Sequence, residues 1–96
     1  MILSVYVGNL KPIFDAVFHL LKKGDVFIFT VERTELDNNY GWKLLSSGRF
    51  AHSEEYIRLL FLEHSGGKAN IWIDNIIPRF ENGQPVEGML VLITMI

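Results

Sequence analysis

Apolar residues gather along the chain into short runs that predict an α/β fold. Residues 2–7 and 26–31 are runs of β-branched and aromatic residues with the length of strands, and both are predicted to be strands. The second run shows no alternation between apolar and polar residues. A strand of this kind is typical of a sheet that helices cover on both faces.

A helix is predicted between these two strands. Asn9 can accept a hydrogen bond from a free N–H group at a helix start, and Pro12 is tolerated in a first turn. Apolar residues then recur at helical spacing at Ile13, Phe14, Val17, Leu20 and Leu21. The pair Lys22-Lys23 is expected to form a basic last turn and Gly24 to end the helix. Strand, helix and strand together predict a right-handed βαβ unit.

Residues 32–52 differ in character and are predicted to be a long loop. They are polar and rich in Asn, Gly and Ser, and they carry several aromatic residues. A loop of this length is unusual in a small domain and typically has a functional role.

A second helix and two further strands are predicted after the loop. Ser53 is expected to cap the helix, which ends at Ser65-Gly66-Gly67. Residues 69–77 and 86–95 are predicted to pair as an antiparallel hairpin through a turn-rich link at residues 78–85.

Composition is consistent with a single globular domain over residues 1–96. Hydrophobic residues make up 49% of the chain and charged residues 21%, and the chain has no cysteine. Stability must therefore come from packing or from association with another chain. The net charge of −2 and the scattered basic residues argue against a nucleic-acid partner. The first residues lack the positive charge of a signal peptide, and the apolar end at 89–96 is short for a membrane span, so a cytoplasmic protein without membrane contact is expected.

Recognisable catalytic motifs are sparse. His19, His52 and His64 lie far apart without metal-binding spacing, so no metal site is expected. A nucleotide-binding βαβ unit needs a motif such as Gly-x-Gly-x-x-Gly after its first strand. Here strand 2–7 is followed by the single glycine Gly8, and no cofactor-binding loop is predicted.

Candidate binding residues concentrate between positions 40 and 56. Tyr40, Arg49, His52 and Tyr56 each have a structural explanation when taken alone, such as an ion pair for Arg49. As a set, they follow the carboxyl end of a buried strand, where open α/β sheets bind ligands. The sequence therefore predicts a binding site in this region.

Four segments together resemble the C-terminal half of a class I S-adenosylmethionine-dependent methyltransferase. The subgroup is the bacterial one found as stand-alone enzymes or behind tetratricopeptide repeats. Residues 5–10 resemble its fourth strand with the following turn, and residues 23–32 resemble its fifth strand. The most specific match is Ser-Gly-Arg-Phe-Ala-His-Ser at 47–53, and residues 79–88 resemble the link between the last two strands.

The resemblance implies a partial Rossmann-like sheet with two main helices. Its local strand order is expected to be 4-5-7-6, with the last strand antiparallel. The family's first three strands, with the glycine-rich motif, are expected to be missing. Two positions depart from the pattern, because Asn9 stands where the family usually has Asp and Gly24-Asp25 where it has Gly-Gly.

Site roles follow from the same resemblance. Gly8 and Asn9 are expected beside the methyl-donor end of the cofactor, which in the complete enzyme is S-adenosylmethionine. Tyr40, Arg49 and Tyr56 are expected to bind an unidentified acceptor, and His52 is the candidate general base. This chain alone is expected to bind no cofactor and to be inactive.

Two functional readings remain open at this point. The first is a truncated methyltransferase; the second is a non-catalytic binding or interaction module on the same scaffold. The predicted partner is either the N-terminal half or a second copy of the chain. Without the first strand, strand 2–7 would have an unpaired edge, which favours self-association.

Overall fold

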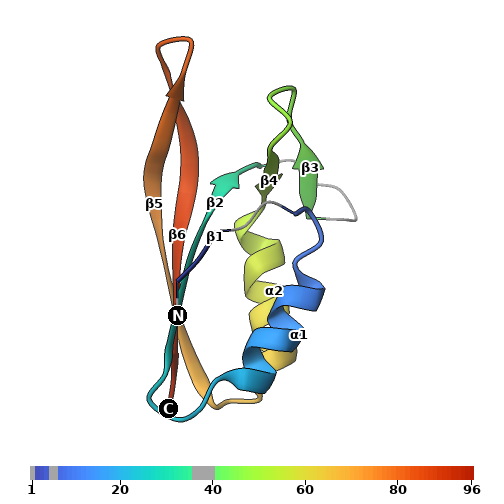
Figure 1. Ribbon diagram of the computed structural model, residues 1–96, viewed down its shortest axis with the longest axis vertical. Helices are drawn as coiled ribbons and strands as arrows, with labels where there is room; N and C mark the ends of the chain where they lie inside the picture. The colour runs from blue at the N-terminus through green and yellow to red at the C-terminus, as the bar shows by residue number, and fades with distance from the viewer. Residues whose placement is uncertain (1, 5–6, 36–40) are drawn as a thin grey trace.

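The computed structural model describes residues 2–4, 7–35 and 41–96, which form a twisted sheet with two helices against one face (Figure 1). The elements in chain order are β1 (Ile2–Ser4), α1 (Lys11–Leu20), β2 (Val26–Arg33), β3 (Trp42–Leu44), β4 (Phe50–His52), α2 (Glu54–Ser65), β5 (Ala69–Glu81) and β6 (Gln84–Met95). This is the α/β class that the sequence predicts.

Strand β2 lies at the centre of the sheet. On one side it pairs in parallel with β1 over Ile28 to Thr30, and farther along with β4 at Glu32 and Arg33. On the other side it pairs antiparallel with β6, which in turn pairs antiparallel with β5. The order β1-β2-β6-β5 confirms the expected 4-5-7-6 arrangement with an antiparallel last strand.

The core lies between the sheet and the two helices. Phe27, Phe29 and Val31 point from β2 into this layer and are buried. The ring of Phe14 from α1 meets Phe29 edge-on, with the centroids 5.9 Å apart at 83°. Buried residues from α2 and β6 complete the cluster; they are Ile57, Leu60, Phe61, Met89, Val91 and Ile93.

The opposite face of the sheet differs from expectation. Burial alternates along β2, where Phe29 is buried while Thr30 is exposed and Ile28 half-buried. Both described helices lie against the same face (Figure 1). The expectation that helices cover both faces of this strand is therefore wrong for the described residues, because a continuous apolar run does not reveal which face a helix will occupy.

Helix α1 also differs from the prediction at both ends. Its N-cap is Leu10, while the Asn9 side chain accepts a hydrogen bond from the Lys11 N–H at 3.1 Å. The helix ends at Leu20, so Lys22-Lys23 and Gly24 lie outside it. The chain turns there because Gly24, with φ of +87°, donates its N–H to Met95.

The predicted long loop contains additional strands. Strand β2 extends to Arg33, and β3 and β4 form a short antiparallel hairpin that closes through Gly48 with φ of +86°. Period-two alternation is hard to detect in strands of three residues, which is why the sequence predicted a loop. Helix α2 begins and ends as predicted, with Ser53 capping it and Gly66 in the left-handed conformation.

Strands β5 and β6 form a hairpin longer than expected. The predicted link at residues 78–85 is wrong, because the strands continue to Glu81 and Gln84 around a two-residue turn. Asn82 and Gly83 both have positive φ, 50° and 76°, as a type I′ turn requires. Pro78, which cannot donate a backbone hydrogen bond, lies at a register shift between Ile76 and Arg79. The tip of the hairpin, called the arm below, projects past the carboxyl end of β2 (Figure 1).

Two further expectations concern the first strand and membrane-spanning helices. The predicted strand 2–7 is described at Ile2–Ser4; residues 5 and 6 lie outside the described part, and Val7 is not in a strand. No helix in the described ranges has the length and apolar character needed to cross a membrane.

Substitutions in α2 test the assignment of the core. Leu60 is 4% exposed and Leu62 is 69% exposed, so the same change can be compared on two faces of one helix. We expect Leu60→Ala to lower the free energy of unfolding by about 2–5 kcal/mol, because it leaves a cavity between α2 and the sheet. Leu62→Ala should change it by less than about 0.5 kcal/mol. Urea denaturation followed by circular dichroism measures both, and equal losses would contradict the assignment.

Candidate functional site

The candidate site lies where the chain passes from the β1 side of the sheet into α1. Gly8 and Asn9 form this turn, and the indole of Trp42 packs directly on Gly8. A Cβ at position 8 would lie 2.3 Å from Trp42 Cε3, which is closer than any side chain permits. Glycine is therefore required at position 8 by the close approach of the hairpin β3–β4.

The His52 side chain forms hydrogen bonds with the backbone of this turn. Its Nε2 lies 2.9 Å from the Gly8 carbonyl oxygen and 3.1 Å from that of Val7. Carbonyl oxygens only accept hydrogen bonds, so Nε2 carries the proton and, in the neutral ring, Nδ1 is the basic nitrogen. Nδ1 is buried and has no hydrogen-bond partner among the described residues. Burial lowers the pKa of His52, and the two backbone hydrogen bonds offset part of that effect.

Tyr56 holds the turn from the side of α2. Its hydroxyl accepts a hydrogen bond from the Leu10 N–H at 2.9 Å and donates one to Asn9 Oδ1 at 3.3 Å. Its ring lies nearly parallel to that of His52, with the centroids 6.2 Å apart. The Ser53 hydroxyl fixes the first turn of the helix by accepting from the Tyr56 N–H at 3.2 Å. Burial raises the pKa of Tyr56, so the hydroxyl stays protonated and able to donate.

The structure brings together four of the six predicted site residues. Gly8, Asn9, His52 and Tyr56 form one cluster, called the turn cluster below, in which His52 is hydrogen-bonded to Gly8 and Tyr56 to Asn9 while the two rings stack. Tyr40 lies outside the described residues.

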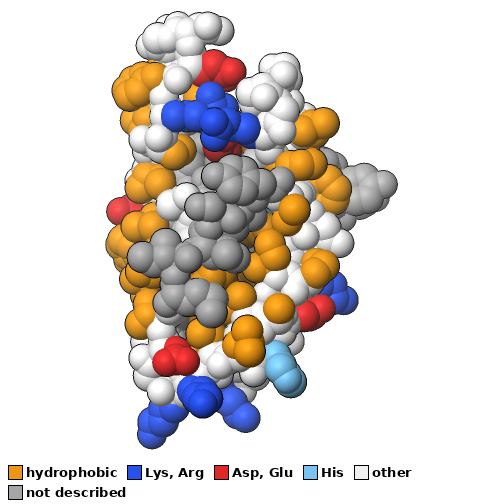
Figure 2. All heavy atoms as spheres, viewed as in Figure 1, with side chains coloured by type: hydrophobic (Ala, Val, Ile, Leu, Met, Phe, Trp, Pro, Cys, Tyr) orange, Lys and Arg blue, Asp and Glu red, His pale blue; other side chains and the backbone are white. Residues whose placement is uncertain are grey.

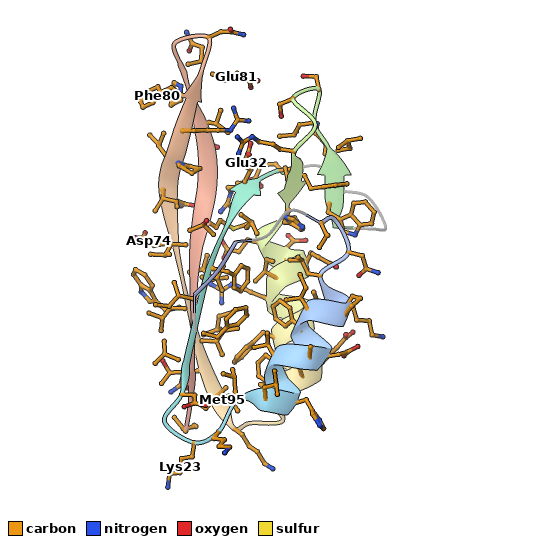
Figure 3. All side chains as sticks on the ribbon, in the orientation of Figure 1. Lys23, Glu32, Asp74, Phe80, Glu81 and Met95 are labelled. Atoms are coloured by element: carbon orange, nitrogen blue, oxygen red, sulfur yellow. The ribbon has the colours of Figure 1, made fainter. Side chains whose placement is uncertain are left out.

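Arg49 contacts a different group. Its guanidinium is 3.9 Å from Glu32 Oε2, at the carboxyl end of β2. Glu32 is largely buried and accepts two hydrogen bonds from Arg79 of the arm, at 2.9 and 3.3 Å. Figure 3 shows Glu32 between the arm and the hairpin β3–β4. An ion pair of Arg49 was one reading of the sequence, but the pairing of Glu32 with Arg79 was not predicted, because the only signal was an acidic residue ending an apolar strand.

A second ionic group surrounds Arg33. Its guanidinium donates to Glu54 at 3.1 Å and to Asn75 at 2.8 Å. Hydrogen bonds from Arg58 and from Arg33 lower the pKa of Glu54. An open cleft of about 670 Å³ adjoins this group; its lining residues are Arg33, Asn75, Ile76, Ile77, Pro85 and Glu87. The cleft was not predicted, because it depends on the register shift in β5.

The chemistry of the turn cluster is that of a fixed backbone turn with one exposed amide. Asn9 is exposed, and its Oδ1 is held by Tyr56 and by the Lys11 N–H. The described residues contain no group of three side chains suited to hold a metal ion.

Comparisons with known proteins find matches among solved structures. No protein-family model matches the sequence, and no curated protein matches it either. Among solved structures, an S-adenosylmethionine-dependent methyltransferase from Methanosarcina mazei superposes with a TM-score of 0.68 at 13% identity. The match covers 99% of this chain and 57% of that chain.

The chain has the fold of part of a methyltransferase. At 13% identity the likeness concerns the fold, and this chain spans a little more than half the length of the structure it matches. The predicted partial methyltransferase fold is confirmed, with two helices on the sheet in the expected strand order.

Removing the Tyr56 hydroxyl tests the architecture of the turn cluster. The Leu10 backbone, which is 1% exposed, would keep its N–H but lose the acceptor. We expect Tyr56→Phe to lower the free energy of unfolding by about 1–3 kcal/mol, since a buried donor is left unsatisfied. Ser46→Ala, which removes an exposed hydroxyl, is the control and should change stability by less than about 0.5 kcal/mol. A neutral effect of Tyr56→Phe in thermal unfolding would contradict the assigned hydrogen bond.

The lowered pKa of His52 predicts a dependence of stability on pH. As the pH falls below about 6.5, the unfolded chain takes up a proton on this histidine before the folded chain does. Stability contributed by the neutral buried ring is thus complete above that pH and lost below it, with a slope of at most about 1.4 kcal/mol per pH unit from this one group.

The variant His52→Gln isolates this contribution. Glutamine keeps an N–H donor for the Gly8 carbonyl but does not titrate, so the loss of stability between pH 6.5 and 5 should be smaller than in the parent. His19→Gln, on the exposed side of α1, serves as the control. Urea denaturation at each pH makes the measurement, and identical pH profiles for His52→Gln and the parent would refute the assignment.

Proposed function

We propose that this chain forms the acceptor-side part of an S-adenosylmethionine-dependent methyltransferase. The observation that carries the proposal is the turn cluster at the carboxyl end of the parallel strands, within a methyltransferase-type strand order. Ligands of open α/β sheets bind outside the carboxyl ends of the strands. Gly8, Asn9, His52 and Tyr56 meet at that edge.

Asn9 is the residue proposed to face the cofactor, and Gly8, which is buried beneath Trp42, is proposed to shape the turn that presents it. Asn9 is exposed at the start of α1, where its side chain can meet a polar group of the ligand. The cofactor, when bound, supplies a methyl group on a sulfonium. The residues present fit only its methyl-donor end, since no glycine-rich loop is found in the sequence.

His52 is proposed to act mainly as a positioning residue. Its Nε2 is committed to two backbone carbonyl groups, and its basic Nδ1 is buried. A general base needs its free nitrogen within hydrogen-bond reach of the proton it removes. This geometry favours fixing the Gly8 turn over proton transfer, and it revises the role first expected for this histidine.

Tyr56 and Arg49 are proposed to serve on the acceptor side in different ways. Tyr56 orients Asn9 through its hydroxyl. Arg49 is 54% exposed at the guanidinium side chain and only loosely paired with Glu32, so it keeps donors for an acceptor. Tyr40 stays an expected acceptor-side residue.

The part of the site that binds the rest of the cofactor is proposed to come from another polypeptide segment. Among the described residues, β1 pairs with β2 alone, so its other edge can accept a further parallel strand. A glycine-rich strand, loop and helix added there would place the helix N-terminus beside Gly8 and Asn9.

A non-catalytic interaction module is the second candidate. The absence of a Gly-x-Gly-x-x-Gly motif from the sequence favours it. The two candidates differ in whether the turn cluster has any affinity for the cofactor.

A titration with S-adenosylmethionine distinguishes these functions. The sequence alone predicts no binding, but the exposed Asn9 of the turn cluster leads us to expect weak, millimolar binding to the chain alone. In ¹⁵N–¹H spectra this binding should appear as shifts confined to the amides of residues 8–11 and the neighbourhood of Tyr56. Asn9→Ala should abolish these shifts, whereas Asn70→Ala, an exposed change on β5, should leave them unchanged.

Each other outcome counts against the proposal. Shifts that are absent, or that map away from residues 8–11, would favour the non-catalytic module. Micromolar affinity would mean that the chain holds the cofactor without a glycine-rich half, which contradicts the proposed division of the site.

A further inference from the structure

The helix-facing side of the sheet continues past the start of α2 and carries polar side chains there. Val31 of β2 and Met89 of β6 pair with each other and lie in the core on that side. Side chains two residues apart on a strand share a face, so Arg33 and Glu87 lie on the same side beyond the core. Asn75 of β5 pairs with Met89 and therefore lies on that side too. Three neighbouring strands thus bring a cation, an amide and a carboxylate to one place.

These three side chains border the open cleft of about 670 Å³ at the base of the arm. Sites for small molecules have volumes of about 300–1,000 Å³ and combine apolar walls with a few polar groups. The apolar part of this cleft consists of Ile76, Ile77 and Pro85. Ile77 is 55% exposed, so a ligand in the cleft can cover it. Size and lining are therefore those of a site for an organic ligand.

Arg33 and Asn75 offer hydrogen-bond donors to the cleft. Arg33 Nη1 donates to Asn75 Oδ1 at 2.8 Å. Because a guanidinium only donates, the amide oxygen of Asn75 must face Arg33, and the NH2 group of the amide has no partner among the described residues. Arg33 Nη2 also makes no hydrogen bond in this part of the chain. Both groups can donate to an oxygen of a ligand.

The charges around the cleft leave one carboxylate unmatched. The Arg33 guanidinium pairs with Glu35 and with Glu54. Glu54 also pairs with Arg58, at 2.8 Å. Two cations thus face three carboxylates, and the third is that of Glu87, which is exposed and has no ion pair or hydrogen bond within the described ranges. The cleft consequently favours a ligand with a positive charge.

Other charged groups at this end of the molecule do not neutralise Glu87. Figure 2 shows side chains of both signs between the arm and the hairpin β3–β4. Arg79, on the arm, pairs with Glu32 at 2.9 Å and with Glu81 at 3.7 Å. Its charge is thus already balanced, and the negative charge of Glu87 stays available to a ligand.

We infer that the cleft binds a small organic amine whose ammonium group lies next to a neutral hydrogen-bond acceptor. Glu87 accepts from the ammonium group, and Arg33 and Asn75 donate to the neighbouring oxygen. Ile77 and Pro85 contact an apolar body. A ligand carboxylate in place of the neutral oxygen adds a negative charge to a cleft that already has an excess of carboxylates, so a zwitterion binds less well. The cleft shares no residue with the turn cluster, and the inference does not depend on the proposed function.

Titration of the full chain with three related probes at pH 7 tests the ligand class. L-phenylalaninol has an ammonium group beside a hydroxyl and should bind with a dissociation constant on the order of 1 mM. Its ¹⁵N–¹H shifts should be confined to the amides of Arg33, Asn75, Ile77 and Glu87. N-acetyl-L-phenylalaninol lacks the charge and should bind about fivefold more weakly or less, since it loses a charge-assisted hydrogen bond. L-phenylalanine, a zwitterion, should bind about threefold more weakly than L-phenylalaninol.

Variants of exposed residues test the two parts of the cleft. Glu87→Gln keeps the shape of the side chain and should weaken L-phenylalaninol about fivefold while leaving the acetylated probe unchanged. Glu63→Gln removes the same charge from an exposed position of α2 and should leave both affinities within about twofold. Ile77→Ser should weaken both probes about threefold, because each loses apolar contact. Circular dichroism establishes that each variant is folded.

The inference is overturned by any of four results. These are no binding of L-phenylalaninol at about twentyfold the expected dissociation constant, equal binding of the charged and acetylated probes, tighter binding of the zwitterion, and an affinity that Glu87→Gln leaves unchanged. Shifts that map outside the cleft count against it in the same way. Repeating the S-adenosylmethionine titration on Glu87→Gln judges the proposed function separately, since the turn cluster is intact in that variant.

Discussion

The pairing of β2 with three other strands is the constraint on which the structure depends. This strand pairs with β1 and β4 on one side and with β6 on the other, and its residues Phe27, Phe29 and Val31 anchor both helices. Because side chains alternate along a strand, the same register that buries these residues turns Ile28 and Thr30 to the opposite face. A slip of one residue would exchange the two sets and destroy the core.

The geometry of the turn cluster depends on the pairing of β2 with β4. Strand β4 joins the end of β2, with His52 opposite Arg33, and this places the imidazole beneath the Gly8 carbonyl. Tyr56 then reaches the same turn from the start of α2. Segments more than 40 positions apart in the chain thus fix one short turn, and the buried polar contacts make that turn rigid.

Because both described helices lie on the same face of the sheet, the molecule is thin. The principal extents are 42 × 25 × 17 Å, so the chain is two layers thick and much longer than it is deep. Sheets of this family of architectures are stable when both faces are covered. The sheet face opposite the helices and the edge of β1 that no described strand pairs with are two separate surfaces.

The sequence by itself determined the two helices, the capped start of α2 and the presence of a hairpin at the end of the chain. These depend on local chemistry, such as the hydroxyl of Ser53 and the turn preference of Asn82-Gly83. The residues of the turn cluster were also candidates from the sequence, through the resemblance stated there. Their roles were not: a sequence does not show that the Nε2 of His52 meets two carbonyl oxygens or that Nδ1 is buried.

Only the tertiary structure decided which face of the sheet the helices cover, that β3 and β4 form a hairpin, and that Glu32 pairs with Arg79. Each depends on contacts between residues distant in the chain, about 47 positions apart for that ion pair. The helix and strand preferences of individual residues do not specify such contacts. Several tertiary arrangements are compatible with the same local pattern, and the free energy of packing decides between them. The long β5–β6 hairpin is the clearest case. Pro78 predicts the end of a strand, but the structure accommodates it at a register shift between β5 and β6. That shift depends on the pairing with β6 and is not visible in the sequence of β5.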